Sequence, residues 1–235
     1  MDYKYKTTFE CPLSSCEISE ASLISQASLD NLAPLVPKNI DYKSNVDLLG
    51  VAFNAAVVNK FNRNGDGMDT ATAKAYTPNF VHKPTNIEHD KEKVVGHIVD
   101  AGFSSFGSNK ILTSDEVDKE KGPFNIALGA VIYKSVNKNF TNLVEKSLDP
   151  DDPAYQKVSA SWEVGFSDYV LAVGSDYLEE AKIISDPEKI QEMKGFLRSY
   201  GGTGKTDKGE SIYRLIVGDI YPLGIAYTLN PAAEV

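Results

Sequence analysis

The 235-residue sequence lacks long apolar runs and has fewer basic than acidic side chains. No apolar stretch approaches the ~20 residues that a membrane-spanning helix needs, and no apolar signal segment follows the polar N-terminus. Lysine and arginine total 24 against 33 aspartates and glutamates, for a net charge of -9. Nucleic-acid binding depends on clustered basic side chains, so we expect no nucleic-acid partner. From the absence of long apolar runs and of a signal segment, we expect a soluble, non-exported protein without a membrane partner.

Residues that build metal or disulfide sites are also scarce. The sequence has two cysteines, Cys11 and Cys16, and three histidines, His82, His89 and His97. A structural zinc site needs about four Cys or His ligands at matched spacing, and none of the histidines is close to the cysteines in sequence. We interpret the cysteines as reduced thiols in a cytosolic chain, with a local disulfide or metal ligation left open. No metal and no cofactor are expected.

The chain is rich in short β-branched and apolar runs separated by turn residues. With 42% hydrophobic residues, it can bury a sizeable core. The runs lie at residues 47–58, 94–99, 125–133, 158–164, 212–217 and 224–229. Helical patterns are fewer and lie at residues 19–32, 139–148 and 185–197. This pattern predicts an α+β fold that is mainly β, either a barrel or a sheet carrying helical inserts.

Two segments fall outside the strand rhythm. Residues 1–45 are predicted to form an N-terminal appendage of a strand and a helix, and residues 46–235 the main domain. Within the main domain, residues 175–210 are predicted to form a peripheral insert with one helix and a glycine-rich loop. The loop at 200–206 ends in Gly-Lys-Thr, but it lacks the first glycine and the preceding strand of a phosphate-binding loop. A flexible loop is the favoured interpretation.

Residues 62–69, Asn-Arg-Asn-Gly-Asp-Gly-Met-Asp, invite comparison with a calcium-binding EF-hand loop. Oxygen-bearing side chains stand at its first, third and fifth positions. The twelfth position is Ala73 in place of the glutamate that completes such a site, and no helical pattern precedes Asn62. A tight Asn-Gly or Asp-Gly turn is therefore favoured, with calcium binding as the minor alternative.

The candidate chemistry lies at His89 and in the run at 157–164. His89 follows turn-prone residues and precedes a β-branched run, so it stands at the mouth of a strand. Ser159, Ser161 and Glu163 alternate with apolar residues and therefore share one strand face. Imidazole titrates near neutral pH and can activate a serine on a neighbouring strand. We predict a protease centre with Ser159 as nucleophile and His89 as base.

Each of these residues also has a purely structural interpretation. His89 alone could be a loop histidine bonded to Asp90, and Ser159 alone could be a polar strand residue that faces solvent. His97 lies within an apolar strand and is interpreted as a satisfied core residue, and His82 as a surface residue. The functional interpretation depends on the order in which the motifs occur.

Taken together, four motifs resemble the tailed-phage prohead proteases, capsid-maturation serine proteases related to the herpesvirus assemblins. They are Asn-Arg-Asn-Gly-Asp at 62–66, Glu-His-Asp at 88–90 leading to Val-Gly at 95–96, Val-Ser-Ala-Ser-Trp at 158–162 and Tyr-Thr-Leu-Asn-Pro-Ala at 227–232. The resemblance spans residues 48–232. It implies a closed β-barrel with flanking helices and a serine endopeptidase that cleaves scaffold, core or capsid-protein precursors, and itself, during phage head assembly.

The resemblance also assigns roles to single residues. The family's histidine falls on His89 and its serine on Ser159, while Ser161, where many relatives have glycine, would lie near the oxyanion site or help to fix the loop. Relatives often carry a glutamate shortly before the terminal Pro-Ala, and the matching position here is Gly224. Asp219 is the nearest acid and is assigned as the third member of the site.

Partners and location follow from the same resemblance. The implied partners are phage scaffold, core and capsid precursors, with a homo-oligomer as a further expectation. The implied location is the prohead or virion interior, and the host bacterial cytoplasm during assembly. The alternative is a catalytically inactive, capsid-associated structural protein that keeps the protease fold, which the absence of glutamate at Gly224 would suit.

Overall fold

The computed structural model describes residues 3–15 and 31–229. Cys16, most of the helix expected over 19–32 and the Pro-Ala pair at 231–232 lie outside the described residues. The side chain of Cys11 is likewise not described. The interpretation of the two cysteines therefore stays a prediction.

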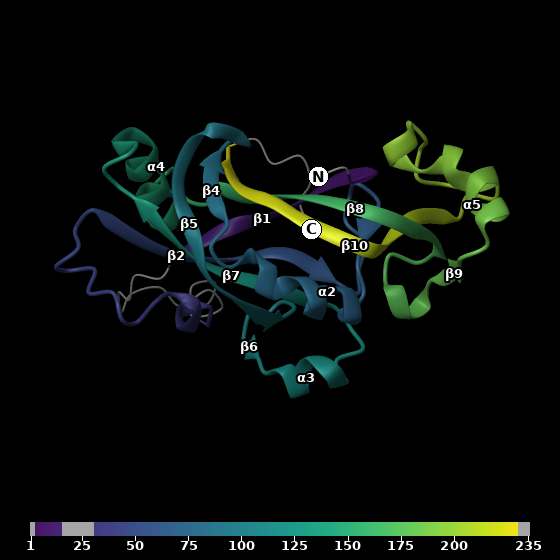
Figure 1. The fold of residues 1–235 in the computed structure, drawn as a ribbon, viewed down its shortest axis with the longest axis horizontal. Helices are drawn as coiled ribbons and strands as arrows, with labels where there is room; N and C mark the ends of the chain where they lie inside the picture. Colours follow the sequence, from purple (N-terminus) through teal and green to yellow (C-terminus); the bar gives the residue numbers. More distant parts are fainter. Residues whose placement is uncertain (1–2, 16–30, 230–235) are drawn as a thin grey trace.

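The strands of the described residues form one mixed sheet (Figure 1). Their order is β3-β10-β4-β5-β7-β2-β1-β8-β9, with β6 paired to β5. Pairing is antiparallel except where β10 runs parallel to β3 and β4. The strands are β1 Tyr5–Ser15, β2 Leu48–Val58, β3 Asp66–Gly67, β4 Pro84–Ile87, β5 Asp90–Ser105, β6 Ile111–Leu112, β7 Phe124–Tyr133, β8 Ser159–Gly174, β9 Lys182–Ile184 and β10 Ser211–Thr228.

The fold is α+β and mainly strands, but the expected closed β-barrel is wrong. The strands form a single sheet, not closed into a barrel, whose end strands in the described part of the chain are β3 and β9. Two of its strands, β8 and β10, are 16 and 18 residues long. They pair with each other along their lengths, and their distal halves extend far enough to take β9 and β3 as partners. Figure 1 shows β8 and β10 crossing the molecule towards the end where β9 lies.

The N-terminal strand, within the segment 1–45 that was expected to be an appendage, pairs into the sheet. β1 lies between β2 and β8 and pairs with both. A short 3₁₀ turn, Ala33–Leu35, follows in the described chain and packs Leu35 against Ala127 on the outer face of the sheet. Gly129 permits this approach, because a Cβ there would lie 2.0 Å from the Leu35 carbonyl oxygen.

The described residues form four short α-helices, and each begins with a side-chain cap. They are α2 Thr70–Tyr76, α3 Ser114–Lys119, α4 Lys138–Leu148 and α5 Pro187–Met193, capped by Asp69, Thr113, Asn137 and Asp186 respectively. In Figure 1, α4 lies at one end of the molecule and α5 at the other. No helix within residues 3–15 and 31–229 is long and apolar enough to span a membrane.

The predicted insert at 175–210 lies at the α5 end of the molecule (Figure 1). It contains β9, which pairs with the distal half of β8. Leu197, just after α5, is only 1% exposed and belongs to the main hydrophobic core. The insert therefore extends the sheet and contributes a buried side chain to the core.

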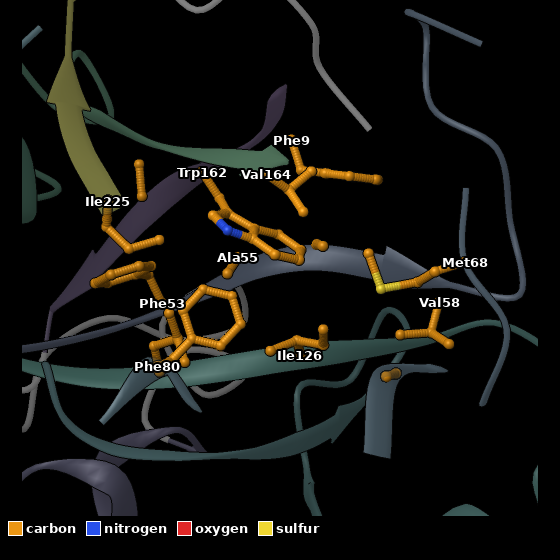
Figure 2. Close-up of a cluster of buried hydrophobic side chains, with 14 of the residues drawn as sticks. Phe9, Phe53, Ala55, Val58, Met68, Phe80, Ile126, Trp162, Val164 and Ile225 are labelled. Atoms are coloured by element: carbon orange, nitrogen blue, oxygen red, sulfur yellow. The ribbon is translucent and has the colours of Figure 1, made fainter. Parts of the chain in front are cut away.

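Trp162 of β8 lies at the centre of the main core (Figure 2). Its indole stacks on Phe9, with ring centroids 5.3 Å apart, and meets the edge of Phe80 at 4.7 Å. Consecutive side chains of a strand point to opposite faces. By burying Trp162, the core therefore fixes β8 so that the two adjacent residues, Ser161 and Glu163, point to the outer face.

Candidate active site

A two-residue turn presents His89 at the junction of β4 and β5. Ile87 pairs with Asp90 across the hairpin, and the two residues between them, Glu88 and His89, have φ angles of +52° and +59°. Two successive positive φ angles are typical of a tight hairpin turn that Asn-Gly usually occupies. Residues with larger side chains are strained there, by roughly 1–3 kcal/mol each. This strain at a candidate catalytic histidine implies that other contacts hold the turn in place.

The imidazole of His89 reaches a serine on β8. Its Nε2 lies 2.8 Å from the Oγ of Ser161, and Ser161 is 1% exposed. On one side β8 pairs with β10, where Ala226 stands opposite Ser161. For the Ser161 hydroxyl to donate a hydrogen bond to Nε2, the neutral imidazole must carry its proton on Nδ1. This is the tautomer in which histidine can act as a general base.

A carboxylate lies behind the histidine. Oε2 of Glu163 is 3.8 Å from Nδ1 of His89, and Lys6 of β1 forms an ion pair with the other carboxylate oxygen. The side chains of Glu163 and His89 are 17% and 25% exposed, so both are partly shielded from water. A negative charge at this position favours the protonated imidazole that forms when the serine loses its proton. Ser161, His89 and Glu163 therefore lie in the order of a Ser-His-Glu triad, with the His89–Glu163 contact longer than a hydrogen bond.

Of the two serines weighed from the sequence, the structure brings Ser161 to His89. Ser159 is two residues away on the same strand, roughly 6–7 Å at the usual rise per residue. It stands opposite Thr228 of β10, beyond the position of Ser161. The residue placed near the oxyanion site by the resemblance is thus the hydrogen-bond partner of the histidine.

Asp219, assigned from the sequence as the third member, lies elsewhere on β10. It is exposed, and its backbone N–H donates to Ser167 Oγ at 2.9 Å. Gly224 is the β10 residue that stands opposite Glu163. Gly224 is five positions from Asp219, roughly 15 Å along an extended strand. Glu163 supplies the carboxylate instead, and the Ser-x-Glu spacing, which places both side chains on one face, was the sequence signal for it.

Asp90, the partner suggested by the structural interpretation of His89, is engaged by other groups. Its carboxylate lies 2.8 Å from Lys93 Nζ and accepts a hydrogen bond from the Glu92 backbone N–H. The hydrogen bond from Lys93, followed by that from the Glu92 backbone, lowers the pKa of Asp90 below its ordinary value. Asp90 thus stays ionised at neutral pH, paired with Lys93.

The other two histidines are not part of the site formed by Ser161, His89 and Glu163. His97 is on β5, and its Nδ1 lies 2.7 Å from the hydroxyl of Tyr133. His82 precedes β4 and is exposed, with a positive φ of +70°. The hydroxyl contact of His97 agrees with its interpretation as a satisfied structural residue.

The calcium-like loop is bonded internally. Both carboxylate oxygens of Asp66 accept from the guanidinium of Arg214, and one also accepts from the Thr7 hydroxyl at 2.6 Å. Asn62 Oδ1 accepts from the Asp66 backbone N–H at 3.0 Å. The loop therefore forms a turn fixed to β10. Across the described residues, no group of three or more His, Cys, Asp or Glu side chains could hold a metal ion.

Comparisons with protein-family models, curated proteins and solved structures find no match to this chain. The class of site is thus defined by its own geometry, a serine, a histidine and a glutamate brought together from β8 and the β4–β5 turn. The resemblance to the prohead proteases stays an expectation based on short motifs.

Proposed function

We propose that the protein is a serine endopeptidase in which Ser161 is the nucleophile, His89 the general base and Glu163 the residue that orients the imidazole. The observation that carries this proposal is the 2.8 Å contact between His89 Nε2 and Ser161 Oγ. A serine hydroxyl is a poor nucleophile until a neighbouring base removes its proton. The Glu163 carboxylate near Nδ1 adds the third group that such a base requires.

The catalytic cycle then follows from the positions of these atoms. Ser161 Oγ bonds to the carbonyl carbon of a peptide while its proton moves to His89 Nε2. The imidazolium next gives that proton to the leaving amine, and the C–N bond breaks to leave an acyl-serine. A water molecule attacks the acyl carbon with His89 again as base, which releases the acid and restores Ser161. Throughout, Glu163 offsets the positive charge on the imidazole.

For the biological role, we propose maturation of a phage prohead by cleavage of scaffold, core or capsid-protein precursors. Support comes from the order of the four motifs, two of which contribute His89 and Ser161 to the site. The partners would be those precursors, and the location the prohead interior. This role is separate from the chemistry, because a Ser-His-Glu site also serves hydrolases of other substrates.

A second candidate is a catalytically inactive, capsid-associated structural protein. The burial of Ser161 favours it, since a residue with 1% exposure must be uncovered before a carbonyl carbon can reach its hydroxyl. The partial exposure of His89 and Glu163 favours the enzyme, because it leaves the imidazole side of the site open to solvent. The two candidate functions, endopeptidase and inactive structural protein, therefore predict different reactivities for the Ser161 hydroxyl.

Fluorophosphonate labelling followed by peptide mapping tests the proposal directly. An active serine hydrolase reacts stoichiometrically through its activated serine, so we expect one adduct, on the β8 peptide at Ser161. Folded protein that gains no adduct at any serine would support the structural candidate. Co-expression with phage scaffold, core and capsid precursors then tests the biological role, with cleaved precursors as the expected result.

Glu163→Gln is expected to slow fluorophosphonate labelling and ester hydrolysis about tenfold to a hundredfold. The neutral amide no longer stabilises the imidazolium and can favour the wrong tautomer. We expect a smaller loss of rate than for the loss of a carboxylate hydrogen-bonded to the catalytic histidine. The His89–Glu163 contact is 3.8 Å long, and Glu163 also forms an ion pair with Lys6. Asp219→Asn is the matched control and should react at the wild-type rate. Slow labelling of Asp219→Asn, together with a wild-type labelling rate in Glu163→Gln, would assign the role of orienting the imidazole to Asp219.

A further inference from the structure

The strained turn that carries His89 is tied to the end of β10 through the residue before it. Both oxygens of the Glu88 carboxylate are engaged, one by the hydroxyl of Thr228 and the other by the backbone N–H of Leu229, each at 2.8 Å. The backbone N–H of Glu88 donates to the carbonyl of Tyr227 at 3.0 Å. Glu88 thus accepts two hydrogen bonds and donates one, and these three bonds fix the turn to three consecutive residues, 227–229.

These anchoring residues are next to the partners of the serine strand. Thr228 stands opposite Ser159, and two residues earlier Ala226 stands opposite Ser161. β10 is therefore the shared support on which the turn and the nucleophile strand are both placed. A change in how Glu88 binds β10 moves the imidazole relative to the Ser161 hydroxyl, since Glu88 and His89 are consecutive residues of one tight turn.

The backbone angles explain why such an anchor is needed. Glu88 and His89 both adopt the left-handed conformation, which side chains other than glycine, asparagine and aspartate rarely take. A turn sequence without glycine or asparagine tends to relax to other angles when nothing holds it. A charged carboxylate that accepts two hydrogen bonds is among the stronger anchors available to a surface turn.

We propose that Glu88 is a positioning residue for catalysis, which clamps the β4–β5 turn to the end of β10 and thereby holds His89 Nε2 within hydrogen-bond distance of Ser161. The inference rests on the proposed function for its kinetic consequences. Its structural content concerns the imidazole alone and can be tested without turnover. Glu88 contacts neither substrate nor reacting atoms, so it acts through His89.

Two changes weaken the clamp from opposite sides. Glu88→Gln keeps the size and the turn position but leaves one neutral acceptor in place of two charged ones, while Thr228→Val removes one donor from β10 and leaves Glu88 intact. Glu92→Gln is the matched control, because Glu92 is an exposed glutamate on the adjacent strand β5 and its replacement changes the net charge equally.

We expect Glu88→Gln to slow fluorophosphonate labelling of Ser161 about tenfold and to lower kcat for a small activated ester with little change in KM. Thr228→Val should act in the same direction and more weakly, and the double variant should be no slower than Glu88→Gln, because both changes break one unit. Glu92→Gln should match the wild-type protein. Equal labelling rates in Glu88→Gln and Glu92→Gln would overturn the positioning role.

The ring nitrogen resonances of His89 provide the readout that does not need activity. In the wild-type protein, at a pH where the imidazole is neutral, they should report one tautomer with the proton on Nδ1. Averaged tautomers in Glu88→Gln, with a single tautomer in Glu92→Gln, support the clamp even if no serine is labelled, in which case the proposed function alone fails. An unchanged His89 tautomer in Glu88→Gln overturns the clamp, whatever the activity.

Discussion

Ser161→Ala is expected to abolish fluorophosphonate labelling and to lower hydrolysis by at least ~10³-fold, whereas Ser159→Ala should keep both. The hydroxyl bonded to His89 Nε2 belongs to Ser161. Ser159 faces the same side of β8 but lies about 6–7 Å further along the strand. One imidazole in a tight hairpin turn cannot serve both hydroxyls at that separation, so only one serine is activated.

The two alanine variants form a matched pair. Each deletes a single hydroxyl from the same strand, and the two serines are similarly buried, at 1% and 5% exposure. Differences in folding should therefore be small, and circular dichroism with thermal unfolding checks this. Labelling that survives in Ser161→Ala and disappears in Ser159→Ala would instead give the attacking role to Ser159, as the motif resemblance implies.

The contrast between the two serines indicates how far sequence reasoning reaches. Strand alternation correctly places Ser159, Ser161 and Glu163 on one face, and turn chemistry followed by a β-branched run correctly places His89 at a strand end. Which serine contacts His89 depends on the distance along β8 at which the β4–β5 turn places the imidazole. That distance is set by the bonds between Glu88 and residues 227–229, which are 140 or so positions away in sequence.

The architecture was harder to predict than the local elements. The runs at 212–217 and 224–229 are separate in the sequence, yet one strand, β10, spans both and continues through Gly218 and Pro222, with register shifts at 217/220 and 222/224. The resulting 18-residue strand pairs with β3, β4 and β8. The sheet has β3 and β9 as its end strands in the described part of the chain, in place of the expected barrel. Propensity and pattern identify strands, but long-range pairing decides their order.

The loop at 62–66 shows a similar limit. Its oxygen-rich pattern indicates either a cation site or a turn, and only the position of Arg214, 148 residues later, shows which positive charge Asp66 meets. Asp66 is 1% exposed and Arg214 4% exposed. The guanidinium also lies over the rings of Phe166 and Tyr169, at 5.3 and 5.7 Å from their centroids. The pair thus connects β3 to β10 in an environment largely removed from water.

The stability of the distal end is therefore expected to depend on this pair. Asp66→Asn should lower the free energy of unfolding by about 3–5 kcal/mol, because removing one partner leaves a buried charge on Arg214 without compensation. The Thr7 hydroxyl, which donates to Asp66 at 2.6 Å, loses a charged acceptor as well. For a chain of this length, such a loss corresponds to a fall in Tm of roughly 10 °C. Urea unfolding measures the free energy.

Two further variants separate the buried charge from the loss of an ion pair as such. Asp118→Asn breaks the exposed ion pair between Lys74 and Asp118, whose side chains are 31% and 56% exposed, and should change the free energy of unfolding by less than ~1 kcal/mol. The double variant Asp66→Asn with Arg214→Met removes both charges and should recover much of the loss. Since the pair lies at the opposite end of β8 and β10 from Ser161, labelling of Ser161 should be unchanged under native conditions. An Asp66→Asn protein within ~1 kcal/mol of wild type would show that Arg214 finds another partner or reaches water.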